Sequence, residues 1–175
     1  PIEYHMNYNK INIPSDTLMT ELNAGDIIYS DLYNYVDTTI LNPFGDNSGV
    51  RYFGMGNKLK SAVSHNVIEY KDFPVHIDET YIFSFYVRTE IDTASIELLL
   101  KDDLMAKESY SRIWSNIGTD WKRIWIKKTF NHYDLDQRDQ EPKAWINIIG
   151  PKSIYIWGFQ LETADFNQEK PREYV

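Results

Sequence analysis

The sequence contains no cysteine, which excludes a disulfide framework, thiol nucleophile chemistry and thiolate metal sites. It also lacks any uninterrupted apolar run near the roughly 18 to 20 residues of a membrane-spanning helix, so we expect no membrane insertion. Positive charge is scarce: 18 Lys and Arg residues stand against 26 Asp and Glu, a formal net charge of −8. Because phosphate neutralisation needs clustered cations, nucleic acid is not an expected partner.

Local signatures of catalysis are missing as well. There is no phosphate-binding glycine-rich loop, no Gly-x-Ser-x-Gly turn and no His-Glu-x-x-His segment, and the four histidines lie far apart. A pair of glycosidase carboxylates leaves no mark in the sequence, because the fold brings such residues together. We predict a protein that is not an enzyme.

What the sequence does have is aromatic side chains. Trp, Tyr and Phe make up 15% of the 175 residues, and 42% of the chain is hydrophobic. This supply fills the core of one domain and leaves rings for its surface. We expect a single domain over residues 1–175. Because the sequence starts at Pro1 with no leader, we interpret it as a module cut from a longer protein.

Strict alternation of apolar and polar residues dominates the chain from about residue 60 onward. In Thr80–Thr89 the odd positions are Tyr81, Phe83, Phe85 and Val87, which predicts a strand with those residues in the core. Further strands with the same pattern are expected at Ser95–Leu100, Lys122–Phe130, Lys143–Ile149 and Ser153–Glu162, the last burying Tyr155, Trp157, Phe159 and Leu161.

The first sixty residues are less decisive. Asp26–Val36 and Val50–Phe53 are possible strands, and residues 1–22 are a possible extended arm that reaches a neighbouring chain. Asp102–Tyr110 reads as either a short helix or a loop. Short strands separated by Asn, Asp, Gly and Pro turns predict an all-β fold, an antiparallel two-sheet β-sandwich or jelly roll of the carbohydrate-binding-module type, best supported over residues 60–175.

The non-core face of these strands suggests a ligand. If the strands lie in one sheet, aromatic rings share a face with guanidinium and amide groups; the candidates are Tyr86, Trp125 and Trp145 with Arg88, Arg123 and Asn147. Flat rings suit the C–H faces of sugars, and planar polar groups suit their hydroxyls. The alternative is that the tryptophans cover a second core, an oligomer interface or the N-terminal arm.

Three further features are weaker candidates. Tyr52, Phe53 and Trp114 are aromatics in expected turns. Lys122, Arg123, Lys127 and Lys128 form a basic patch that suits an acidic polymer or simply guards a strand edge. The oxygen-rich stretches Asp134–Glu141 and Asp46–Gly49 suit a structural Ca²⁺, or are solvated acidic loops.

Three strands carry a resemblance to a known family. Ile154–Glu162 with Tyr174-Val175, the stretch Tyr81–Arg88, and Trp121-Lys122-Arg123 with Phe130 resemble jelly-roll carbohydrate-binding-like modules of bacteriophage tail, baseplate and fibre proteins. Phe159 stands where that pattern has a small residue, and the threonine usual before Tyr174 is missing.

The resemblance implies a non-enzymatic, extracellular module on a virion that binds host cell-wall or envelope polysaccharide and contacts other virion subunits, with a homo-oligomeric parent protein and sometimes a structural Ca²⁺. Two alternatives stay open: a structural or oligomerisation domain of the virion, and a binding module of a secreted polysaccharide-degrading enzyme.

Overall fold

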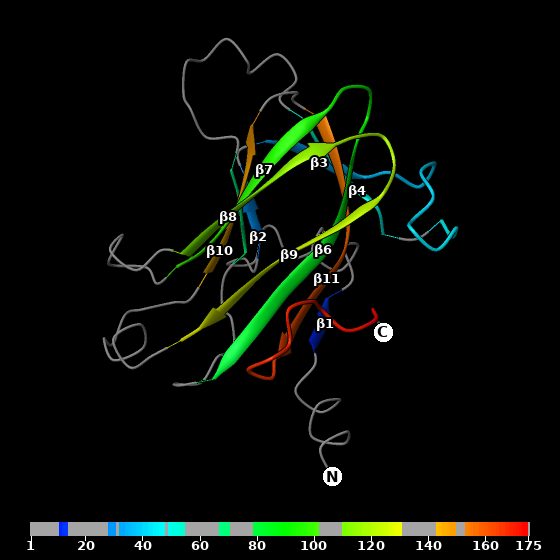
Figure 1. Cartoon of the computed structure of the whole chain (residues 1–175). Coiled ribbons are helices and arrows are strands. Elements are labelled where there is room, and N and C mark those ends of the chain that lie inside the picture. The colour runs from blue at the N-terminus through cyan, green and yellow to red at the C-terminus, as the bar shows by residue number, and fades with distance from the viewer. Residues whose placement is uncertain are drawn as a thin grey trace.

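The structure is a computed structural model and describes residues 11–13, 28–30, 32–47, 49–54, 67–70, 79–101, 110–130, 143–149 and 153–174. Within these ranges the fold is all-β and consists of two antiparallel sheets (Figure 1). A search of the same residues for a helix long and apolar enough to cross a membrane finds none.

One sheet, here called sheet A, has six strands in the described part of the chain. Its order is β3 (Tyr33–Val36), β4 (Arg51–Gly54), β11 (Ser153–Thr163), β6 (Thr80–Thr89) and β9 (Lys122–Thr129), and β1 (Ile11–Ile13) also pairs with β11. Sheet B has five strands within the described ranges, in the order β2 (Ile28–Ser30), β5 (Val67–Tyr70), β10 (Lys143–Ile149), β7 (Ala94–Lys101) and β8 (Tyr110–Ile117). This arrangement confirms the predicted two-sheet sandwich.

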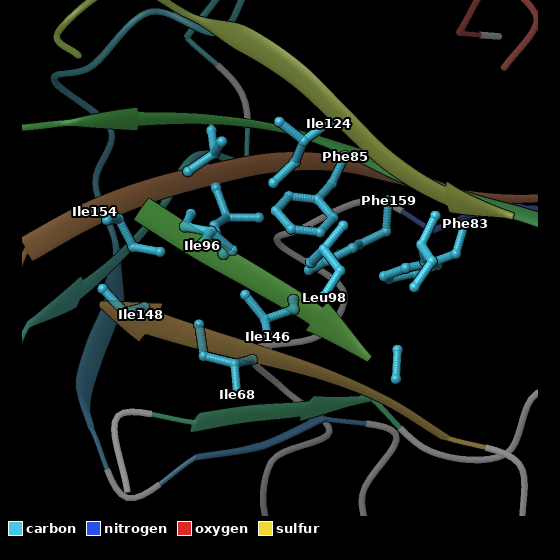
Figure 2. Packing of buried hydrophobic residues seen from close by; sticks show 14 of the residues in the cluster. Ile68, Phe83, Phe85, Ile96, Leu98, Ile124, Ile146, Ile148, Ile154 and Phe159 are labelled. Carbon is cyan, nitrogen blue, oxygen red and sulfur yellow. The ribbon is translucent and has the colours of Figure 1, made fainter. Parts of the chain in front are cut away.

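The core lies between the two sheets (Figure 2). Phe83, Phe85 and Phe159 meet there from sheet A, with the Phe83 and Phe159 rings stacked at 5.6 Å between centroids. Sheet B contributes Ile96, Leu98 and Ile146 among others. The alternation predicted for Thr80–Thr89 is confirmed, since all four odd positions belong to the core cluster and no even position does, although Ile82 and Ser84 on the other face are also buried.

The alternation predicted for the last strand is wrong in its first half. Ile154 and Ile156 belong to the core cluster, whereas Trp157 is only partly buried and does not. Gly158 has a φ of +72°, and the pairing register with β6 shifts between Trp157 and Gln160. This bulge adds one residue to β11, so the odd-numbered residues face outward before it and into the core after it. Phe159 and Leu161 are therefore in the core as predicted, while Tyr155, although buried, faces outward with Trp157.

Other differences concern the weaker segments. The stretch predicted as one strand, Asp26–Val36, contains β2 and β3, which lie in different sheets. Ile11–Ile13, within the possible arm, pairs with β11 of the same chain. Strand β8 was not predicted at all, and residues 102–109 of the helix-or-loop segment lie outside the described residues.

Candidate functional site

The predicted binding residues fall on two different sheets. Tyr86 and Arg123 are paired neighbours on β6 and β9 of sheet A, and Trp125 follows Arg123 on the same face. Trp145 and Asn147 lie on β10, in sheet B. The expectation of one shared sheet is therefore wrong. Alternation tells which face of a strand is apolar but not which strands pair, and the outer faces of a sandwich point away from each other.

The outer face of sheet A is crossed by the C-terminal segment, residues 164–174 (Figure 1). Arg123 Nη1 donates to the carbonyl of Arg172 at 2.6 Å. Trp125 Nε1 donates to the carbonyl of Glu169 at 3.0 Å. Burial lowers the pKa of Arg123 from its ordinary value. Tyr86 and Glu162 act in the other direction and raise this pKa, but burial is the larger effect. Arg123 and Trp125, two of the predicted sugar-binding residues, therefore bind the C-terminal segment of the same chain.

Glu162 anchors this segment. Its side chain is fully buried on the outer face of β11 and accepts hydrogen bonds from Arg172 N at 2.7 Å and Arg172 Nη1 at 3.3 Å. Arg172 also reaches the exposed Asp165 at 3.5 Å. Gln160, likewise buried, donates to the Arg172 carbonyl at 3.5 Å. Gln160 and Glu162 therefore belong to a structural network, as their position opposite Leu161 suggests.

Tyr86 belongs to an aromatic cluster that closes over the β11 bulge. Its ring centroid lies 5.8 Å from that of Trp157 and 6.5 Å from that of Tyr174. Phe44, from the loop before β4, adds a third contact at 5.9 Å. Gly158 lies beneath, where a Cβ would meet Tyr174 at 3.3 Å and Tyr86 at 3.4 Å. This cluster leaves Tyr86 packed against other rings rather than displayed as a platform.

Arg88 and Tyr52 are part of a second row on the same sheet. Tyr35, Tyr52, Tyr155 and Arg88 are successive partners across β3, β4, β11 and β6. The Tyr52 ring centroid lies 5.0 Å from Tyr35 and 5.3 Å from Tyr155, and the Arg88 guanidinium lies 5.5 Å from the Tyr155 ring. Burial, with the charge of Glu90 second, raises the pKa of Tyr155 to about 12. The tyrosine rings pack against one another at tilted angles, so Tyr52 and Tyr155 are engaged within the sheet.

The turn aromatics lie in strands. Tyr52 and Phe53 are in β4, and Phe53 is fully buried in the core, which removes it as a ligand contact. Trp114 is in β8, at the edge where sheet B meets β9 of sheet A. Its ring centroid is 4.6 Å from that of Trp125, and its Nε1 donates to the Trp125 carbonyl at 3.0 Å.

Cations surround these two tryptophans. The Arg112 guanidinium lies 3.9 Å from the Trp114 ring centroid and 5.0 Å from that of Trp125. Lys122 Nζ lies 5.4 Å from the Trp114 ring. Beside them is an open groove of about 410 Å³, lined by Arg112, Trp125, Lys127, Lys128, Thr129 and Glu169, which we call the edge groove.

Trp145 and Asn147 occupy the outer face of sheet B, on its central strand. Trp145 pairs with Leu99 and Asn147 with Glu97 of β7, and all four side chains are partly exposed. Ile113 of β8 is 57% exposed and pairs with Glu97. This face thus combines an indole ring, an amide and a carboxylate, which suit the apolar faces and the hydroxyls of sugars.

The structural Ca²⁺ stays a prediction at both expected stretches, since Ser48 of Asp46–Gly49 also lies outside the described residues. Asp46 closes a turn that is already satisfied by Asn42, whose side-chain oxygen accepts from Asp46 N at 3.1 Å and Phe44 N at 2.9 Å. No group of three or more acidic or histidine side chains able to hold a metal occurs in the described ranges. Residues 134–141 lie outside them, so calcium binding there stays a prediction.

Arg112 and the exposed Glu169 are candidate residues that sequence reasoning missed. Arg112 lies in β8, whose apolar residues Ile113, Trp114 and Ile117 follow helical rather than strand spacing. The signal that could have found it is the nearby Trp114, two residues later on the same face. Nothing in the sequence places Glu169 opposite β9.

No protein-family model matches the sequence, and no curated protein matches it. Solved structures do. The CBM22-1–GH10 modules of Clostridium thermocellum xylanase 10B, complexed with xylohexaose, align with 83% of this chain at 10% identity and a TM-score of 0.56; the match spans 27% of that chain. The CBM22-1 xylan-binding domain of Paenibacillus barcinonensis Xyn10C aligns with 78% of this chain and 83% of its own, at 10% identity and a TM-score of 0.54.

A third structure, BiXyn10A CBM1 without ligand, aligns with 88% of this chain and 97% of its own length at 16% identity and a TM-score of 0.51. These likenesses establish the fold as the jelly-roll β-sandwich of carbohydrate-binding modules. None of them is a bacteriophage tail protein, so that part of the sequence resemblance gains no support from the structures described above.

Proposed function

We propose that this chain is a non-catalytic polysaccharide-binding module that binds through the outer face of sheet B. The observation that carries the proposal is Trp145, partly exposed on the central strand and flanked by Asn147 and Glu97. The C-terminal segment binds to the opposite sheet, where it takes up the hydrogen-bonding groups of Arg123 and Trp125. The fold shared with modules that are described as xylan-binding supports the same function.

The parent protein that this fold favours is a polysaccharide-degrading enzyme. One similar structure joins the binding module to a xylanase domain. The alternative hypothesis, that the module serves adhesion of a phage tail to the host envelope, is supported by the sequence motifs in β6, β9 and β11 alone. Labelled protein that binds intact bacteria but not plant-type polysaccharides would favour the phage assignment.

Trp145→Ala tests the proposed face. Affinity electrophoresis in gels that contain xylan or hydroxyethyl cellulose measures retardation of the native protein. We expect the variant to bind about tenfold more weakly or worse, because truncating a central aromatic contact removes most of its contribution. Trp121→Ala is the matched control: Trp121 is also partly exposed, but its Nε1 donates to the Leu41 carbonyl at 3.0 Å and it lies beside sheet A.

Equal binding by the Trp145 variant and the wild-type protein would remove this face from the proposal. If neither polysaccharide retards the wild-type protein and light scattering finds a defined oligomer, the structural alternative replaces the binding function. In that case Trp145 would lie at an interface between subunits.

A further inference from the structure

The geometry points to a second binding site, the edge groove, which takes the carboxylate or phosphate groups of an anionic polysaccharide. This site is separate from the outer face of sheet B and does not depend on the function proposed for that face. It lies between β8 and β9 and the C-terminal segment, and one wall is the ring of Trp125.

Charge is the first reason. Among the described residues, the groove is lined by the cationic side chains Arg112, Lys127 and Lys128 and by one carboxylate, that of Glu169. The chain as a whole carries a net charge of −8, so this local excess of positive charge opposes the overall field. Such a concentration of one sign attracts ligands of the other sign and fixes where they bind.

The partners of these cations are the second reason. Arg112 is exposed and lies against the rings of Trp114 and Trp125, with no ion pair to a carboxylate among the described residues. Lys127 Nζ donates to the carbonyls of Phe166 at 3.1 Å and Gln168 at 2.6 Å, which are neutral partners. Both side chains are thus positioned without their charge being neutralised.

The rings explain why the ligand is recognised through its charge. The Arg112 guanidinium sits 3.9 Å from the centroid of Trp114, so a sugar ring has little of that face to stack on. Stacking also holds the planar guanidinium in one orientation, which favours two parallel hydrogen bonds to a carboxylate or phosphate. The ring of Trp125 lines the groove and is partly exposed.

Polygalacturonate and polyglycerol-phosphate teichoic acid are the probes, and fully methyl-esterified polygalacturonate is the neutral control with the same backbone. Binding is measured by calorimetry at 150 mM salt, where weak nonspecific attraction is screened. We expect at least one anionic polymer to bind and the esterified polymer not to. Arg112→Gln should weaken binding about fivefold or more.

Two further variants make the test specific. Glu169→Gln removes the one carboxylate that the described residues contribute to the groove and should tighten binding about two- to threefold, an effect that misfolding does not produce. Lys170→Gln removes an exposed charge from the same segment outside the groove and should change binding less than twofold.

The proposal is overturned if neither anionic polymer binds, if the esterified polymer binds equally well, or if Lys170→Gln costs as much as Arg112→Gln. Equal affinity for polyglutamate would also overturn it, because the groove would then bind polyanions without regard to the sugar. Binding to xylan is not a readout here, so this inference and the proposed function can fail separately.

Discussion

The burial of Glu162 predicts that its carboxylate contributes much more than that of the exposed Asp165 to holding Arg172 and the C-terminal segment. Arg172 reaches two carboxylates: Glu162, whose side chain is fully buried, and Asp165, whose side chain is 68% exposed. The pair offers a matched comparison, since the guanidinium is shared and only the surroundings of the acid differ. Glu162→Gln and Asp165→Asn remove each charge while keeping the shape of the side chain.

The expected costs differ by several-fold. Glu162 accepts from Arg172 N at 2.7 Å and Arg172 Nη1 at 3.3 Å, and hydrogen bonds to a charged group contribute about 1.5–3 kcal/mol each. The amide of the glutamine keeps one acceptor but turns a donor toward Arg172, which is 24% exposed and can regain water. We therefore expect a loss of about 1.5–3 kcal/mol for Glu162→Gln. For Asp165→Asn we expect less than about 0.5 kcal/mol, as for other exposed ion pairs.

Urea unfolding followed by tryptophan fluorescence measures both values. A double-mutant cycle with Arg172→Ala isolates the guanidinium contribution, because the Arg172 backbone N still donates to Glu162 in every variant. We expect about 1 kcal/mol or more of coupling to Glu162 and nearly none to Asp165. Equal costs for the two acid variants would refute the reasoning that burial, rather than proximity to Arg172, decides the contribution.

Three further predictions concern sheet A. Gly158→Ala should destabilise the fold by about 1–2 kcal/mol in thermal melts, since φ is +72° and a Cβ would meet Tyr174 at 3.3 Å; unchanged stability would contradict the bulge. Phe159→Ala should cost about 3–5 kcal/mol of unfolding free energy, because the ring is 1% exposed and stacked on Phe83; a loss below 1 kcal/mol would place it outside the core. In the folded protein the pKa of Tyr155 is raised to about 12, so the tyrosine of the unfolded chain loses its proton at a lower pH. The free energy of unfolding should therefore be highest below pH 10 and fall by up to about 3 kcal/mol as the pH rises to 12. Tyr155→Phe should lose less stability than the wild-type protein between pH 9 and 11, and identical pH profiles would contradict this shift.

Sequence reasoning was most accurate where one face of a strand is fully buried. In β6 the odd residues Tyr81 to Val87 are all in the core, because alternation is a direct consequence of strand geometry. The same reasoning missed β8, an edge strand with Ser111, Arg112 and Ile113 all exposed, so no alternation of burial marks its sequence. It also assumed that a single alternation of inward and outward residues runs through the whole of β11. The isolated Gly158 was the available sign that a bulge interrupts it.

The candidate site was harder to predict than the fold, for a reason that Trp125 and Trp145 illustrate. Both were correctly assigned to outer faces, since their neighbours Ile124 and Ile146 are in the core. Their grouping depended on strand order, which is a long-range property that local patterns do not specify. The C-terminal segment could not be foreseen either, because its contacts on β9 run through its backbone carbonyls and leave no side-chain signature.

The two proposed sites also differ in what preorganises them. The outer face of sheet B rests on paired strands, so Trp145 and Asn147 are held by the ladder between β10 and β7. The edge groove depends on the C-terminal segment, whose carbonyls fix Lys127 and whose Glu169 forms part of the wall. A site built from a loosely held segment loses affinity by the entropy of ordering it. Weakening the Glu162 anchor should therefore impair binding of the anionic polymer through the groove while leaving the ladder of sheet B intact, which links the stability of the segment to one of the two surfaces alone.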